Sequence, residues 1–193
     1  MKVIFISLIT AATLLSACGG NKKSEKEITA TNDTVQTQAP VAVNTTGSAG
    51  SVNVLVTEYL VLKNALVSDE GATAASAAKN IVDAISKNDD ATFTADQKKL
   101  FDDVKHDMKE HAEHISTNAG KLDHQREHFD MLSKDMYDMV KVFKPSQALY
   151  QTHCPMFNDT KGASWLSETK EIKNPYYGKK MLDCGMVKEE LMP

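Results

Sequence analysis

A histidine, a cysteine and a methionine lie within four residues of one another near the C-terminus. They are His153, Cys154 and Met156 in the segment YQTHCPMFND. Thiolate and thioether sulfur atoms are soft donors that favour Cu(I) or Ag(I) over hard cations. Pro155 disfavours helical geometry at the preceding residue, and residues two apart in an extended chain point the same way. Cys154 and Met156 are therefore expected to face one ion together.

A second segment, KKMLDCGMVKEE, again combines thiol and thioether groups, and its cysteine, Cys184, follows Cys154 by thirty residues. We expect both segments to contribute to one soft-metal site, in which Cys154, Met156 and Cys184 bind a single Cu(I) ion. The remaining candidate ligands are Met181, Met186, His153, His128 and His124.

The same cysteines allow a different interpretation. The chain has three cysteines, and Cys18 lies in the N-terminal segment, so Cys154 and Cys184 form an even pair. In an oxidising compartment such a pair commonly forms a disulfide. Closing this loop would stabilise the fold by roughly 3 to 4 kcal/mol. The protein would then have a structural or partner-binding role without a metal, and the sequence leaves both alternatives open.

Five of the six histidines gather in the middle of the chain. They are His106, His111, His114, His124 and His128. Within each of the pairs 111/114 and 124/128, the spacing places both side chains on one helix face. Two imidazoles four residues apart can chelate one metal ion, as in zinc sites. In a segment as polar as KEHAEHIS, however, His106 and His111 are expected to be solvated surface residues.

Apolar residues recur at helical spacing beyond residue 51. Four helices are predicted, with apolar positions that span residues 54–66, 72–85, 100–115 and 122–143. Thr94 and Gln97 form a capping-box signal before the third helix, and Pro145 ends the fourth. Because the links are short, we predict an all-α fold, an antiparallel four-helix bundle with Met136 and Met139 in its core.

The chain after Ser146 loses this periodicity. Gly162, Pro175 and Gly178 interrupt it, and it holds the single tryptophan, Trp165. We expect an irregular C-terminal segment that packs on the bundle with Trp165 as its anchor.

The N-terminus has the pattern of an export signal. Lys2 precedes the apolar run VIFISLITAATLL at residues 3–15, which is too short to span a bilayer comfortably. The run ends in Leu-Ser-Ala-Cys, which resembles the lipobox of bacterial lipoproteins, a family in which the cysteine is acylated and becomes the first mature residue. The resemblance implies a signal peptide at 1–17 and lipidation at Cys18. It also implies localisation in the bacterial cell envelope, facing the periplasm or in the outer membrane, with the lipid anchor as the contact with the membrane.

Composition supports this organisation and excludes several functions. Residues 18–50 are polar and contain no aromatic side chain, so they are expected to form the lipidated cysteine and a flexible tether. Residues 51–193 then form one helical domain with the Cys/Met-containing C-terminal segment. A net charge of −4 argues against nucleic acid as a partner. The chain has no Cys-x-x-Cys pair, nucleophile elbow or His-Glu-x-x-His helix, so we do not expect an enzyme.

The cysteine segments resemble the small heavy-metal-binding module of bacterial copper-transporting ATPases and copper/silver efflux proteins. Residues 154–156 match its Cys-Pro-Met head, and residues 184–186 match the end of its Cys-x-x-Cys-Gly-Met tail. Two positions depart from that pattern, because Met181 replaces the first tail cysteine and Phe157 stands where the module has a histidine. The resemblance implies Cu(I) or Ag(I) as the bound ion.

Residues 54–191 also resemble a helical domain-of-unknown-function family of bacterial envelope proteins. The likeness rests on HQREHF, LSKDMY and CPMFNDTKGASWLSETKEIKNPYYGKKM. Members of that family occur as lipoproteins and fused to periplasmic adaptors of copper/silver efflux pumps. This implies a lipoprotein that binds a soft heavy-metal ion and hands it to an efflux adaptor. The alternative is the structural or partner-binding lipoprotein with a Cys154–Cys184 disulfide.

Overall fold

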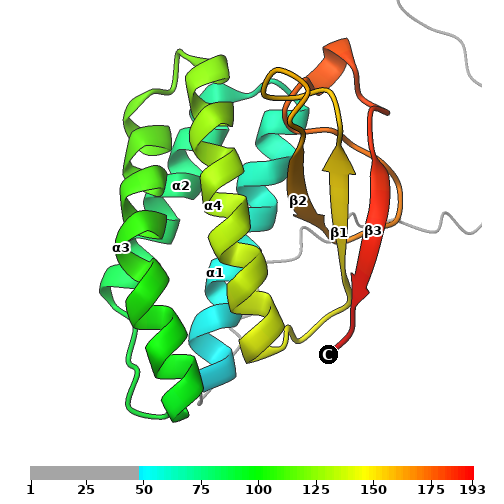
Figure 1. Cartoon of the computed structure of the whole chain (residues 1–193). Helices are drawn as coiled ribbons and strands as arrows, with labels where there is room; N and C mark the ends of the chain where they lie inside the picture. Colours follow the sequence, from blue (N-terminus) through cyan, green and yellow to red (C-terminus); the bar gives the residue numbers. More distant parts are fainter. Residues whose placement is uncertain (1–47) are drawn as a thin grey trace, which may run out of the picture. The chain divides into compact units, whose positions relative to one another are not determined.

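Four helices form an antiparallel bundle in the structure, a computed structural model that describes residues 48–193 (Figure 1). They are α1 (Ser48–Val67), α2 (Gly71–Ser86), α3 (Ala95–Thr117) and α4 (Leu122–Phe143). The capping box predicted at Thr94 and Gln97 begins α3, and α4 ends two residues before Pro145. The helical part of the prediction is therefore confirmed. The predicted signal peptide, Cys18 and most of the tether lie outside the described residues.

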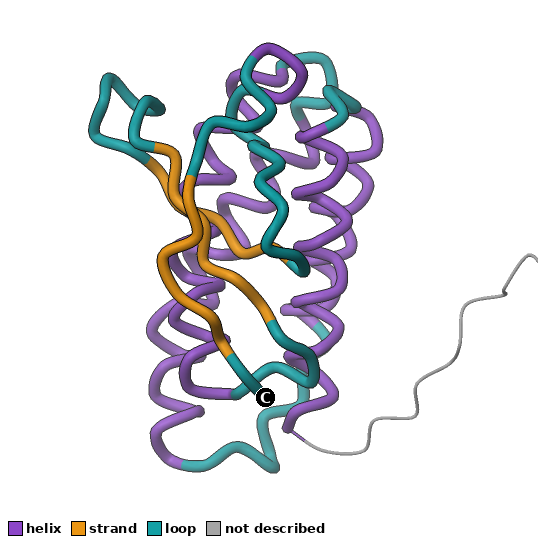
Figure 2. Tube along the Cα trace, turned by 90° about the vertical axis from the view of Figure 1, so that its right-hand side faces the viewer, coloured by secondary structure: helices purple, strands orange, loops and turns teal. Residues whose placement is uncertain are grey.

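The C-terminal segment forms a three-stranded antiparallel sheet in place of the irregular structure that the sequence predicted. Its strands are β1 (Leu149–Cys154), β2 (Ala163–Ser167) and β3 (Met186–Leu191), in the order β2-β1-β3, and a short 3-10 helix, η1 (Gly178–Lys180), precedes β3. The prediction of a purely all-α fold is wrong for this part of the chain. The sheet lies against one side of the bundle, over α1 and α4 (Figures 1 and 2).

The sequence did not predict the strands, because buried and exposed residues do not alternate along β1 and β3 as they do in a regular strand with one buried face. The pairing of β1 with β3 shifts register between Gln151 and Thr152, so that the buried residues Leu149 and Thr152 lie three apart. A bulge of this kind interrupts the period of two. β3 is exposed along most of its length and so carries no apolar alternation at all.

Aromatic side chains join the sheet to the helices. Tyr59 of α1 is fully buried and stacks on Phe129 of α4, with ring centroids 5.2 Å apart. Its hydroxyl oxygen accepts a hydrogen bond from the backbone N–H of Leu166 in β2 at 3.0 Å. Trp165 is 1% exposed, which confirms its predicted role as an anchor. The same core contains Met136 and Met139, as predicted.

Two buried basic side chains, Lys63 and Arg126, fix the C-terminal segment further. The buried ammonium of Lys63 lies 2.8 Å from the carboxylate of Glu168, which follows β2 directly. Arg126, near the start of α4, donates hydrogen bonds to the carbonyl oxygens of Leu66 at 3.1 Å and of Pro175 at 2.9 Å. Arg126 therefore ties the end of α1 and the segment before η1 to one end of the bundle.

Every helix within residues 48–193 is too short or too polar to span a membrane.

Candidate metal centres

The structure brings the two predicted cysteine segments together. Cys154 is the last residue of β1, and Cys184 lies in the turn between η1 and β3. Their Sγ atoms are 3.0 Å apart, and both are free cysteines. Cys154 is fully buried, whereas Cys184 is half-buried. An ion or oxidant from solvent therefore meets the sulfur of Cys184 first.

Strand pairing and a close backbone approach place Cys184 beside β1. β3 pairs with β1 through Met186 opposite His153, which draws the preceding turn toward the end of β1. Gly185 permits this approach, because a Cβ atom at that position would lie 2.9 Å from the Trp165 indole ring. The side-chain amide of Asn174 also donates a hydrogen bond to the Cys184 carbonyl oxygen at 2.7 Å.

Asn174 belongs to a turn that sequence reasoning did not connect with the site. Its Oδ1 accepts hydrogen bonds from the backbone N–H groups of Tyr176 at 2.8 Å and Tyr177 at 3.2 Å. The Asn-Pro dipeptide at 174–175 is a turn signal in the sequence. Only the fold shows that this turn supports Cys184.

The electrostatics of the thiol pair oppose ionisation of Cys184. The hydrogen bond with Cys154, together with partial burial and the charge of that neighbour, raises the pKa of Cys184 to about 11. The Asn174 side chain and the backbone of Met156 act in the opposite direction and lower this pKa in part. A thiolate at Cys184 that lies 3.0 Å from a second thiolate therefore needs a cation to offset the repulsion between them.

The methionines of the two segments are accessible to solvent. Met156 and Met186 are each 48% exposed, and Met181 is partly exposed. Met156 begins the turn after β1, where its carbonyl oxygen accepts a hydrogen bond from the Tyr177 hydroxyl at 2.9 Å. This bond fixes the backbone of Met156 near the thiols while its thioether side chain stays available.

His153 does not share the environment of the thiols. Successive residues of a strand point to opposite faces of the sheet, so His153 points away from the face of Cys154. Its Nδ1 lies 3.0 Å from the Ser164 hydroxyl on β2. His153 is therefore held on the other side of β1.

His124 and His128 lie with other histidines between α3 and α4. The His128 ring is stacked on that of His114, with centroids 4.2 Å apart, and meets that of His124 edge-on at 4.6 Å. His111 Nδ1 is 3.1 Å from His128 Nδ1. His111 is thus half-buried and hydrogen-bonded, unlike the solvated residue that the sequence suggested, whereas His106 is 85% exposed as expected.

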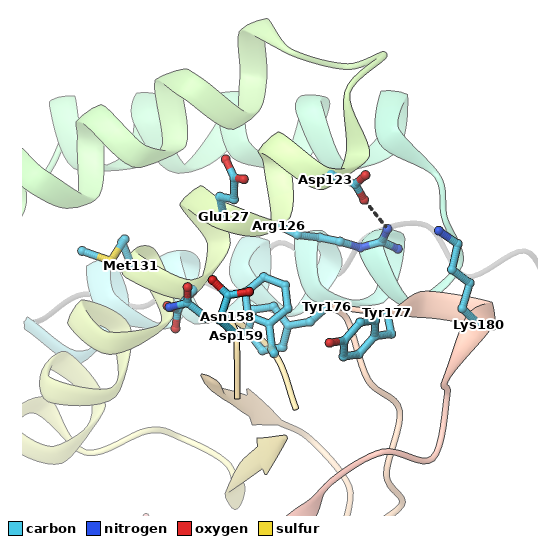
Figure 3. A pocket seen from close by; sticks show the side chains of 11 residues that line it. Asp123, Arg126, Glu127, Met131, Asn158, Asp159, Tyr176, Tyr177 and Lys180 are labelled. Carbon is cyan, nitrogen blue, oxygen red and sulfur yellow. Dashed lines mark ion pairs between the residues drawn. The ribbon is translucent and has the colours of Figure 1, made fainter. Parts of the chain in front are cut away.

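A cavity of about 520 Å³ lies between α4 and the turn after β1 (Figure 3). Arg126 and Asp123, 3.6 Å apart, line it together with Tyr176 and Tyr177. The guanidinium of Arg126 is occupied by Asp69 and by backbone carbonyl groups. Its role in this cavity is to join α1, α4 and the segment before η1, and we assign the cavity no ligand.

The described domain is thus a four-helix bundle with an added antiparallel sheet, and it holds a partly buried dithiol and a cluster of imidazoles. Residues 55–148 match the model of a family described as "Protein of unknown function (DUF3347)". This match supports the expected likeness to an uncharacterised family over the bundle, and it ends before β1, so it includes the histidine cluster and excludes both cysteines. No curated protein and no solved structure matches the chain.

Proposed function

We propose that the protein binds one soft heavy-metal ion, Cu(I) or Ag(I), through the thiolates of Cys154 and Cys184. The observation that carries this proposal is the 3.0 Å separation of the two sulfur atoms, which come from segments thirty residues apart in the chain. Thiolate and thioether donors favour Cu(I) and its mimic Ag(I) over hard cations. A cation between the sulfurs also removes the repulsion that opposes ionisation of the second thiol.

Met156 is the best-placed third donor. It follows Cys154 by two residues, and its side chain is 48% exposed. Met181, three residues before Cys184, supplies a further thioether group, whereas Met186 pairs with His153 and so points, like His153, away from the face of Cys154. The donor set therefore fits a soft monovalent ion better than Zn²⁺, which prefers a closed set of four thiolate or imidazole ligands.

The envelope setting and the efflux partner rest on sequence. The lipobox-like Leu-Ser-Ala-Cys at residues 15–18 supports a lipid anchor in the bacterial envelope. The likeness of residues 154–156 and 184–186 to heavy-metal-binding modules supports a role in copper or silver handling. We propose that the bound ion is passed to a periplasmic efflux adaptor.

The same sulfur separation supports a second candidate function. Two thiolates that bind one ion tetrahedrally at about 2.3 Å lie roughly 3.7 Å apart, so the sulfurs must separate slightly to admit a metal. A disulfide needs them to approach to about 2.05 Å. In an oxidising compartment the pair would then close a structural disulfide, and the protein would act as a structural or partner-binding lipoprotein without a metal.

Titration of the reduced protein with Cu(I) or Ag(I), under competition with a chelator, tests the metal function. We expect one tight site, which Cys154→Ser and Cys184→Ser each weaken by several orders of magnitude because each variant loses a thiolate. Met156→Leu should weaken it less, since a neutral thioether is lost and the apolar volume is nearly kept. Met192→Leu is the matched control, because Met192 is 58% exposed and lies beyond β3, away from the thiol pair.

The disulfide function predicts a different outcome. Protein taken from the envelope would contain no free thiol, and either serine variant would lose stability while Met156→Leu changed nothing. If that pattern occurs and the reduced protein takes up no Cu(I), the metal function is refuted.

A further inference from the structure

Three imidazoles converge between α3 and α4, away from the thiol pair. His114 on α3 and His124 and His128 on α4 each offer a ring nitrogen, and these nitrogens all lie within 4.8 Å of one another. Nitrogen ligands around a tetrahedral ion at about 2.0 to 2.1 Å lie roughly 3.3 Å apart. To bind one ion, the rings of His114 and His128, which stack with an interplanar angle of 5°, must rotate until their nitrogen lone pairs converge.

Neighbouring groups already orient two of the three rings. The Nδ1 of His128 lies 3.1 Å from Nδ1 of His111, and the Nδ1 of His124 lies 3.3 Å from the carboxylate of Glu127. With their Nδ1 atoms engaged in this way, both rings keep Nε2 for a metal ion. Metal-binding histidines commonly have such a partner on the second ring nitrogen, where it fixes the orientation and tautomer of the ring.

The cluster also favours the neutral imidazole, which is the form that binds metals. Burial, followed by the nearby His114, His124 and His111, lowers the pKa of His128 to about 4, against a small opposing effect of Glu127. His128 is therefore uncharged at neutral pH. Access from solvent remains, because the side chains of His114 and His124 are 45% and 36% exposed.

We propose that His114, His124 and His128 bind one divalent transition-metal ion of the kind that imidazole prefers, such as Zn²⁺, and that His111 and Glu127 position two of these ligands. This site shares no residue with the dithiol and has a different ligand chemistry, because imidazole suits Zn, Cu(II) and Ni whereas paired thiolates suit Cu(I). Three protein ligands leave a position open for water or an exchanging ligand. The protein would then hold two ions of different chemical class.

Titration of the full chain with Zn²⁺, followed by the imidazole resonances in nuclear magnetic resonance spectra, tests this site directly. We expect the resonances of His114, His124 and His128 to shift together up to one equivalent. His128→Ala should weaken Zn²⁺ binding by at least about 100-fold, since loss of an orienting partner alone costs about 10- to 100-fold. His106→Ala is the control for loss of a histidine outside the cluster, because His106 lies on α3 with His114 but is 85% exposed.

Two further variants keep the test decisive. His114→Asn replaces a half-exposed side chain and should also weaken binding without affecting folding. The double variant Cys154→Ser/Cys184→Ser should retain Zn²⁺ binding at the histidines, which separates this site from the proposed thiol function. Imidazole resonances that do not move, or equal affinity in His114→Asn and the unmodified protein, would overturn the proposal.

Discussion

The histidine cluster makes the stability of the fold depend on pH in a defined direction. In the folded chain the pKa of His128 falls from 6.5 to about 4, because the ring is partly buried and faces His114, His124 and His111. The unfolded chain therefore binds more protons between pH 6.5 and pH 4, and the stability rises with pH across that window. The contribution is fully present above pH 6.5 and is lost as the pH falls through 4.

The size of this stability contribution follows from the pKa shift of His128. At 1.36 kcal/mol per pKa unit the upper limit is about 3 kcal/mol, and screening of a half-exposed ring by water reduces it to about 1 to 2 kcal/mol. The change in the free energy of unfolding can be measured by urea denaturation at pH 7 and pH 4.5, with circular dichroism as the signal and a chelator present. Between these pH values, His128→Asn should lose about 1 to 2 kcal/mol less stability than the unmodified chain.

Comparison between variants is needed because Asp135 has the opposite effect. Burial, followed by Asp107 and Asp138, raises the pKa of Asp135 to about 6, so its contribution to stability falls as the pH rises. Asp135 is present in both proteins and cancels in the difference, and His106→Ala provides a control for the loss of any histidine. Equal pH dependence in His128→Asn and the unmodified chain would refute the electrostatic reasoning.

Three further results are expected. Glu168→Gln should cost about 1 to 3 kcal/mol in urea denaturation, because it leaves the buried ammonium of Lys63 without a charged partner, whereas Lys63→Met should be nearly neutral. Tyr59→Phe should cost about 1 to 2 kcal/mol in the same assay, since it leaves the buried N–H of Leu166 without its acceptor; an unchanged midpoint would contradict that role. Cys18→Ala should move the protein from the membrane fraction to the soluble envelope fraction with unchanged helical circular dichroism, and continued membrane association would refute the lipid anchor.

The helices could be predicted from sequence because each carries its own signal. The apolar spacing of α3 and α4 reflects burial against the bundle, and Thr94 with Gln97 marks one boundary through local hydrogen bonds. The strands could not be predicted in the same way. The bulge in β1 places the buried residues Leu149 and Thr152 out of phase, and β3 buries too little surface to show a pattern.

Of the two candidate sites, the cysteine pair could be predicted from the sequence and the histidine cluster could not. Matching residue chemistry was enough to associate Cys154 with Cys184, but the placement of the histidines depends on which helix faces meet. His111 and His128 are equally far in sequence from the centre of the α3–α4 link, and residues so related face each other in an antiparallel helix pair. That symmetry is visible in the sequence once the two helices are known to be adjacent, and it was the missing signal.

The direction of α1 gives the domain two unlike poles. α1 begins at Ser48 at one pole, and the end of α1, the start of α4 and the end of β1 all meet at the other (Figure 1). The seventeen residues from Gly50 to Leu66 span about 24 Å of helix. Both candidate sites therefore lie toward the pole opposite Ser48, so one end of the domain carries the dithiol and the imidazole cluster together.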